Sequence, residues 1–265
     1  MFCLNLRSAT SVLHCRSPFS LTLPPPKRHP NLSFPFKPYV KMSATPKHTV
    51  EHIVLFKVKD DTDPTKVHSM ITNLNGLTSL DSVLHLSAGA LHRTKSSPFP
   101  FTHMLHSRYP SKDHLSTYSA HPSHVSVVKE FVLPICEDVM AVDWVADDLH
   151  GSVLPPPGSA LRVTFLKLKE NLGQQVKDEI LGVIKGIKER IGGVEQITCG
   201  ENFSPARAKG YSIASLAVFG GVSELDALDS KEELVSVEKE KVKDYLESVI
   251  VVDYQLPASS QSASL

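Results

Sequence analysis

The sequence has little of what marks disulfide-stabilised, membrane-spanning or nucleic-acid-binding proteins. Its 265 residues include four cysteines and one tryptophan, and 28 lysines and arginines are balanced by 28 aspartates and glutamates. No apolar run reaches the roughly 18 residues needed to span a bilayer, and no basic excess is available to neutralise phosphates. Cys136 and Cys199 have no neighbouring cysteine in sequence, so we expect buried thiols rather than a metal or redox pair. The composition excludes a disulfide scaffold and predicts neither a membrane nor a nucleic-acid partner.

Acidic residues are absent from the first 50 positions, which hold seven of the lysines and arginines and eight of the 19 prolines. This composition is typical of an import signal and not of a folded core. Basic residues at Arg7 and Arg16 interrupt the apolar run that a secretory signal would need. We therefore predict that residues 1–48 form a disordered, cleavable targeting leader for a plastid or mitochondrion, and that the remainder is mildly acidic.

The two ends of the chain predict more than one destination. Met42 offers a second start that would discard the leader, and residues 258–265 form a flexible tail ending in Ala263, Ser264 and Leu265. That ending loosely resembles the peroxisomal Ser-Lys-Leu address but lacks its lysine. We expect the choice of start to sort the protein between chloroplast and peroxisome, with the mitochondrion or cytosol as alternatives.

An internal repeat organises the rest of the chain. The segment HIVLFKVKD at residues 52–60 recurs as RVTFLKLKE at 162–170, and VMAVDW at 139–144 recurs as VIVVDY at 249–254. Both pairs are offset by 110 residues, which indicates two copies of a unit of about 100 residues. We predict a first domain at 49–147, a linker at 148–159 and a second domain at 160–257. The linker contains three consecutive prolines, Pro155 to Pro157, and should be stiff and extended.

Each copy shows the element order β-α-β-β-α-β. In copy one, Asp63 and Ser111 are predicted to cap helices, and Pro122 is predicted to restart one. In copy two, an apolar stripe predicts one helix from Leu172 to Ile191, and a charged segment at 232–248 predicts a solvent-facing helix. The predicted strands of copy one lie at 49–59, 83–91, 101–109 and 139–145.

The first strand predicts how the sheets must pack. Residues 52–56, HIVLF, are apolar on both faces apart from His52, so both faces of the sheet need cover. Helices can cover one face, and a second sheet must cover the other. We therefore predict an α+β fold in which two ferredoxin-like units form a dimeric α/β barrel, with antiparallel sheets face to face and helices outside. Pairing within one chain, as an internal pseudo-dimer, and pairing between two chains, as a homodimer, both satisfy this demand.

Histidine is absent after residue 150, although the chain has 13 histidines. Burying a polar group without a partner costs about 1–3 kcal/mol, so a scaffold that folds with apolar residues does not need these groups for stability. The candidate site residues of copy one are His52, His103, Tyr118 and His124. Their counterparts 110 residues later are Arg162, Ile213, Leu228 and Leu234. This contrast favours a polar pocket in copy one, with local hydrogen bonding and a zinc site as the alternatives.

The remaining histidines of copy one are expected at surface or edge positions without a role. His121 precedes a proline and is expected to act only at the helix break. The sequence contains no nucleophile elbow, Walker loop, dinucleotide glycine motif or HExxH helix, which excludes the commonest hydrolase, kinase and dehydrogenase motifs. The histidines expected at the surface are His68, His85, His92, His106, His114 and His150.

The segments VEHIVLFKVKD, FTHMLHSRYPSKDHLSTYSAHPSHV and VDW resemble the plant stress-response A/B barrel family of dimeric α+β barrels. The second copy resembles a divergent member, so the resemblance covers the whole chain beyond the leader. It implies the ferredoxin-like unit, assembly through facing sheets and frequently a homodimer, and some two-domain members are peroxisomal. It does not by itself imply an enzyme.

Copy one also resembles olivetolic acid cyclase, a polyketide cyclase of this fold. That resemblance implies that Tyr118 and His124 form an acid/base pair for an aldol closure, while His52 and His103 hold or polarise the substrate. It further implies a Mg²⁺ ion bound by backbone carbonyls where the first helix ends, at Asn75, Gly76 and Thr78; no other cofactor is expected.

We therefore predict a stress-response barrel protein that is non-catalytic or binds a small apolar ligand. The two alternatives are a polyketide-cyclase-like lyase and a heat-stable structural oligomer.

Overall fold

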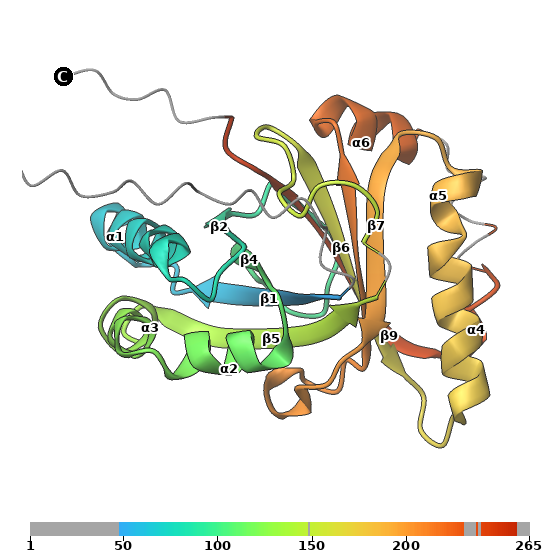
Figure 1. The fold of residues 1–265 in the computed structure, drawn as a ribbon, viewed down its shortest axis with the longest axis horizontal. Coiled ribbons are helices and arrows are strands. Elements are labelled where there is room, and N and C mark those ends of the chain that lie inside the picture. The colour runs from blue at the N-terminus through green and yellow to red at the C-terminus, as the bar shows by residue number, and fades with distance from the viewer. Residues whose placement is uncertain (1–47, 148, 231–236, 238–239, 259–265) are drawn as a thin grey trace, which may run out of the picture. The chain divides into compact units, whose positions relative to one another are not determined.

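The computed structural model describes residues 48–147, 149–230, 237 and 240–258 (Figure 1). The predicted leader therefore lies outside the described residues except for its last residue, and so does the predicted tail except for its first. Part of the helix predicted at 232–248 also lies outside them, at residues 232–236, 238 and 239. Its end is described, and there the prediction is wrong, because residues 246–248 already belong to the last strand. This strand carries the VIVVDY repeat, so the β pattern extends three residues further back than we predicted.

Copy one has the predicted order of elements plus one short extra strand. The two predicted caps are present: Asp63 accepts a hydrogen bond from the Thr65 backbone, and Ser111 accepts one from that of His114. At the predicted helix break, the His121 ring accepts a hydrogen bond from the Ser123 backbone and caps the next helix. A π-helical turn, Val128–Val132, continues the third helix. The elements are β1 (Thr49–Val58), α1 (Pro64–Gly76), β2 (His85–Ala90), β3 (Arg93–Ser96), β4 (His103–Tyr109), α2 (Lys112–Ala120), α3 (Pro122–Val127) and β5 (Cys136–Ala146).

Copy two repeats this order. The single helix predicted up to Ile191 is divided at Gly186, where one helix ends and a short one begins. No helix among the described residues is both long and apolar enough to cross a membrane. The elements are β6 (Ala160–Leu168), α4 (Gln174–Lys185), α5 (Ile187–Arg190), β7 (Val194–Glu201), β8 (Ile213–Phe219), α6 (Val222–Asp229) and β9 (Leu246–Gln255).

The two antiparallel sheets have the same topology. The first has the strand order β2-β4-β1-β5, and the second has β3-β9-β6-β8-β7. If β3 is left out, the first and third long strands of each copy lie at the centre of its sheet, and the second and fourth lie on the outside. Strand β3 belongs to copy one in sequence but pairs with β9 of copy two, and we did not predict it. The fold class is confirmed as two tandem ferredoxin-like units.

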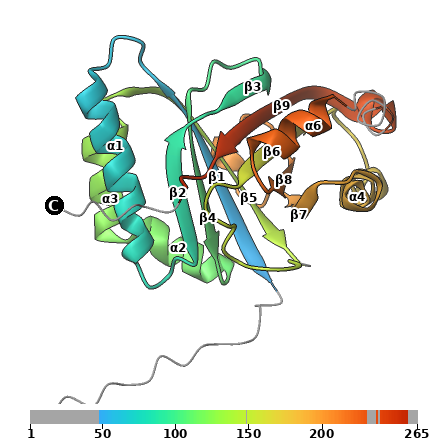
Figure 2. The same cartoon turned by 90° about the horizontal axis from the view of Figure 1, so that it is seen from above.

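The sheets face each other within one chain (Figure 2). Ile53 and Leu55 of β1 are fully buried in a cluster that also contains Leu161 and Phe165 of β6. Phe56 and its neighbours on the opposite face of β1 pack under the helices of copy one. The two-sided apolar strand is therefore covered as its sequence demands, by helices on one face and by the second sheet on the other.

Two glycines allow the sheets to approach at their edges. A Cβ atom at Gly89 of β2 would lie 3.1 Å from the Tyr254 hydroxyl of β9. A Cβ atom at Gly200 of β7 would lie 3.0 Å from both the Trp144 Cβ and the carbonyl oxygen of the next residue in β5. Tyr254 and Trp144 are repeat counterparts. At both sheet edges, therefore, a glycine of one copy packs against an aromatic residue of the last strand of the other copy.

Candidate functional site

The candidate site lies on the helix-facing side of the first sheet. His52 projects from β1 and Tyr109 from β4, whereas Tyr118 and His124 come from α2 and α3. Alternation along β1 puts His52 on the same face as Phe56, which packs under the helices. Proline at position 122 separates the two helices and sets His124 on its own short element.

Three of the four predicted residues form one aromatic cluster around Tyr118. Its ring centroid lies 4.5 Å from that of His124 and 6.5 Å from that of His52. Tyr109, which we did not predict, adds a fourth ring 5.1 Å from that of Tyr118. Tyr118 is thus in ring contact with both histidines.

The hydroxyl of Tyr118 is buried without a hydrogen bond among the described residues. Only 1% of Tyr118 is exposed. The neighbouring Tyr109 hydroxyl shares a hydrogen bond of 2.9 Å with Ser107. Burial raises the pKa of Tyr118 to about 12, although the neighbouring Tyr109 lowers it. At neutral pH Tyr118 is therefore an uncharged donor with its proton unused.

His52 pairs with an aspartate that we did not predict. Its Nδ1 lies 2.5 Å from the Asp143 Oδ1, and the two residues are register partners on β1 and β5. Burial raises the pKa of Asp143, but His52 and the Ser204 hydroxyl outweigh burial and hold it below its usual range. Because an ionised carboxylate only accepts, the His52 Nδ1 carries the proton of this hydrogen bond. The repeated VDW and VDY motifs contain this aspartate in both copies. The sequence alone did not show that it lies opposite His52 in the sheet, so we did not predict the pair.

His124 is held in the same tautomer by the backbone. Its Nδ1 lies 3.0 Å from the carbonyl oxygen of Ser119, which can only accept. Burial is the largest cause of a lowered pKa of His124, so the ring is neutral at pH 7 and its Nε2 can accept a proton. The cluster therefore combines the Tyr118 phenol with the neutral imidazole of His124 and with the His52 ring that is paired to Asp143.

His103 is not brought to this cluster. It is paired with Phe56, whereas His52 is paired with Ser107, so the two histidines are four residues apart along the strands, or roughly 13 Å. His103 shares a hydrogen bond of 2.9 Å with Thr102, and burial lowers its pKa. A role of His103 at the same site stays a prediction.

The predicted Mg²⁺ ligands lie where α1 ends, and the side chain of Asn75 is already engaged there. Its Oδ1 accepts from the Ala88 backbone N–H at 2.9 Å, and its Nδ2 donates to the carbonyls of Ala88 and Ile71. The Gly76 carbonyl accepts from Ser79, and Thr78 is exposed. Among the described residues no group of three or more histidine, cysteine or carboxylate side chains could hold a metal ion. Asn75 fits a clasp between α1 and β2, and a carbonyl-bound Mg²⁺ stays a prediction.

The equivalent place in copy two is filled by ion pairs. Arg162 replaces His52 and donates to Asp253, the counterpart of Asp143, and to Asp229, each at 2.8 Å. Arg93 of β3 donates to the same Asp253 at 2.5 Å. Burial raises the pKa of Asp229, but hydrogen bonds from Arg162 and Lys95 outweigh burial and lower it to about 2. Copy two therefore contains permanently charged, mutually neutralised groups where copy one contains titratable ones.

A second polar cluster, between the sheets, was missed. Glu51 is fully buried; it lies 2.8 Å from Arg108 and 2.7 Å from the His106 Nε2, and it accepts a hydrogen bond from Thr198 of copy two. Burial raises the pKa of Glu51, but Arg108 and His106 hold it well below its usual range. Arg108 also donates to Gln196 of copy two. The expectation that His106 lies at the surface is wrong, because it completes this network.

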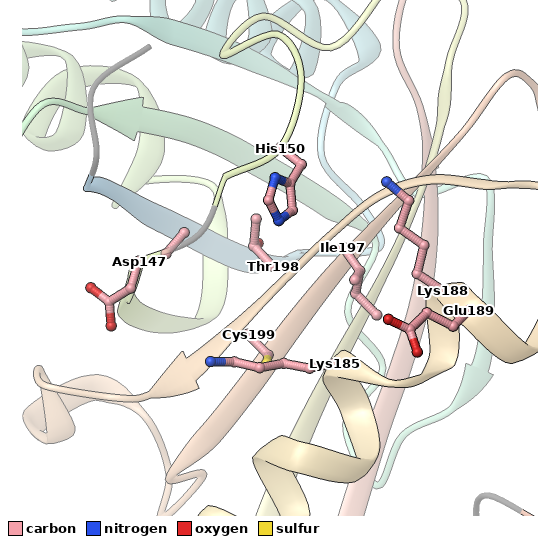
Figure 3. Close-up of a pocket in the computed structure, with 9 residues that line it drawn as sticks. Asp147, His150, Lys185, Lys188, Glu189, Ile197, Thr198 and Cys199 are labelled. Carbon is pink, nitrogen blue, oxygen red and sulfur yellow. The ribbon is translucent and has the colours of Figure 1, made fainter.

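Two hollows lie where a last strand passes the other sheet. One has a volume of 230 Å³ and is lined by residues of both signs, including Asp147, Lys185, Lys188 and Glu189, with His150 of the linker (Figure 3). The other, of 480 Å³, lies between β2 and the end of β9. None of the four predicted residues lines either hollow.

The comparisons with known proteins agree on one family. The model of the stress responsive A/B barrel domain matches residues 50–146 and 161–256. A stress-response A/B barrel domain-containing protein of Arabidopsis thaliana is 53% identical in an alignment of 270 positions that covers 100% of each chain. A second Arabidopsis thaliana protein of the same description is 46% identical over 80% of this chain and 98% of its own.

Solved structures show the same fold at low identity. A Fusobacterium nucleatum protein named as a candidate monooxygenase is similar with a TM-score of 0.56 at 14% identity, over 78% of this chain and 92% of its own. An anthrone oxidase-like protein is similar with a TM-score of 0.54 at 12% identity, over 83% of this chain and 97% of its own.

Proposed function

This chain belongs to the stress responsive A/B barrel family, and from its own site we propose that copy one binds a small, flat apolar molecule that carries a hydrogen-bond acceptor. The ligand lies against the helix-facing side of the first sheet, beside α2 and α3. The Tyr118 hydroxyl donates to its acceptor.

The observation that carries this proposal is the unused donor of Tyr118. A buried hydroxyl without a partner costs about 1–3 kcal/mol, and this one lies between two histidine rings at the centre of a cluster. Its counterpart in copy two is Leu228, so the fold does not require a hydroxyl here. A ligand carbonyl would supply the missing acceptor.

The surroundings define the chemistry of the ligand. The rings of Tyr109, Tyr118, His52 and His124 offer aromatic faces and edges, which favour a flat ligand. Tyr118 and His124 carry no charge at pH 7 by the directions of their pKa shifts, so neither of these two groups attracts an anion. An aromatic ketone has the required chemistry: a flat ring, a carbonyl acceptor and no charge.

A matched pair of probes tests the proposal. Isothermal titration compares 2,4-dihydroxyacetophenone, which has a carbonyl, with 4-ethylresorcinol, which lacks it. We expect the wild type to prefer the ketone by about fivefold, the effect of one net hydrogen bond of about 1 kcal/mol. Tyr118→Phe should remove that preference, while Tyr211→Phe, far from the cluster and bonded to Ser248, should keep it. Equal binding of the ketone by wild type and Tyr118→Phe would reject the proposal.

The His52–Asp143 pair supports a second candidate function, cyclase-like acid/base catalysis. In an aldol closure, a bare Nε2 of His124 or His52 would take a proton from the carbon between two ketones. That carbon would then bond to a third carbonyl carbon, and Tyr118 would protonate the resulting alkoxide and regain its proton from the imidazolium. No oxidant or reductant is needed.

Turnover separates the two candidates. A linear tetraketide thioester would be converted by the wild type, and its cyclised product would be detected by mass spectrometry. Asp143→Asn keeps the shape of the pair but removes the charge that orients His52, so it should lower the rate far more than the affinity. If the wild type binds the ketone probe but does not cyclise the thioester, the binding function is supported and the catalytic function is rejected.

A further inference from the structure

A short segment of each copy, which we call its arm, crosses the last strand of the other copy. The backbone N–H of His92, just before β3, donates to the carbonyl of Asp253 at 2.8 Å. The backbone N–H of Phe203 in copy two donates to the carbonyl of Asp143 at 3.0 Å. Asp143 and Asp253 are repeat counterparts, so the two arms make the same exchange in opposite directions.

The residue that follows this backbone contact differs in charge and size between the two arms. In the arm of copy one it is Arg93, whose guanidinium reaches Asp253 and joins the ion network around Arg162. In the arm of copy two it is Ser204, which lies close enough to the Asp143 side chain to lower its pKa and whose backbone N–H is fixed by Asn202, the residue that also binds the Asp143 backbone N–H. One aspartate is therefore neutralised by guanidinium groups, whereas the other retains the imidazole of His52.

We infer that the arm of copy two, residues 202–205, is a wall of the ligand site of copy one and that Ser204 is the residue that keeps this site available. A side chain the size of arginine at this position would engage Asp143, as Arg93 engages Asp253, and would compete with His52 for that carboxylate. This inference rests on the proposed function and deepens it, because it assigns part of the specificity of copy one to copy two.

The arm is fixed firmly enough to play this part. The Oδ1 of Asn202 accepts from the backbone N–H of Asp143 at 3.1 Å and from that of Ser204 at 2.9 Å. The Phe203 ring packs against the helix-side cluster that includes Tyr118, and the Lys112 ammonium lies 4.2 Å from its centroid. Both ends of the contact with Asp143 are thus held by hydrogen bonds and packing.

The first test compares two arginine substitutions in the full-length protein. Ser204→Arg should weaken binding of 2,4-dihydroxyacetophenone by at least about tenfold. Ala206→Arg places the same charge on an exposed residue two positions further on and should bind as the wild type does. Unchanged affinity of a folded Ser204→Arg variant would overturn the inference. If that variant does not fold, Ser204→Gln, which adds bulk without charge, should show the same loss in weaker form, and its unchanged affinity would overturn the inference equally.

The second test needs no ligand and therefore separates failure of the arm from failure of the proposed function. Nitrogen-15 NMR of the imidazole rings should show His52 with its proton on Nδ1 in the wild type and in Ala206→Arg. In Ser204→Arg the guanidinium competes for Asp143, so the His52 ring signals should shift toward a mixture of tautomers. Unchanged His52 signals would overturn the role of Ser204, even if the wild type binds the probe. A wild type that binds no probe but shows the shifted signals would reject the proposed function alone.

Discussion

Replacing Tyr118 with phenylalanine should make the protein more stable, which is unusual for a change to a residue that is 1% exposed. The substitution removes a buried hydroxyl that has no hydrogen bond among the described residues and keeps the ring contacts with His52 and His124. Because an unpaired buried hydroxyl costs about 1–3 kcal/mol, we expect the free energy of unfolding to rise by about 1 kcal/mol.

Tyr254 provides the matched control. It is 2% exposed, and its hydroxyl shares a hydrogen bond of 2.7 Å with Ser87. Tyr254→Phe leaves the serine unpaired and should lower the free energy of unfolding by about 1 kcal/mol. The two variants should therefore differ by about 2 kcal/mol, or roughly 4–8 °C in midpoint for a protein of this size.

Urea unfolding followed by circular dichroism measures both variants under one set of conditions. Equal m-values would show that both variants expose the same amount of surface on unfolding. If Tyr118→Phe is destabilised as much as Tyr254→Phe, the Tyr118 hydroxyl has a partner in the native protein, and the reasoning that leads to a ligand acceptor is refuted.

Three further predictions concern other parts of the chain. Burial lowers the pKa of His85 to about 3. Since the unfolded state binds this proton near pH 6.5, the free energy of unfolding should fall as the pH drops from 6.5 towards 3. In urea titrations, His85→Gln should flatten that decline. Gly200→Ala should lower the free energy of unfolding by about 1–3 kcal/mol through overpacking, whereas Gly192→Ala, with nothing within 4 Å of the added Cβ, should not. Fluorescent fusions that start at Met1 and at Met42 should reach different compartments, and identical localisation would contradict dual targeting.

The fold could be predicted from the sequence because its signals are local and repeated. The two-sided apolar pattern of β1 demanded helices on one face and a sheet on the other, and the offset of 110 residues supplied that sheet. Strand β3 escaped prediction because Arg93 to Ser96 is a polar segment whose partner residues on β9 are about 160 positions away. Its pairing is a property of the assembled sheets and not of its own sequence.

The candidate site was predictable in part for the same reason. The loss of His52, Tyr118 and His124 from the second copy identified three residues that the structure brings together. Asp143 was not predicted, because its meaning depends on the register of β5 against β1. Ser204 was even less accessible, since only the exchange of arms places it beside a carboxylate of the other copy.

The most direct test of the account is a side-chain NMR map of the complex with 2,4-dihydroxyacetophenone. We predict intermolecular contacts between the ketone and the rings of Tyr118 and His124, together with a slowly exchanging Tyr118 hydroxyl proton bonded to the ligand carbonyl. Contacts confined to the hollow beside Lys185 and Lys188, with the Tyr118 signals unmoved, would contradict it.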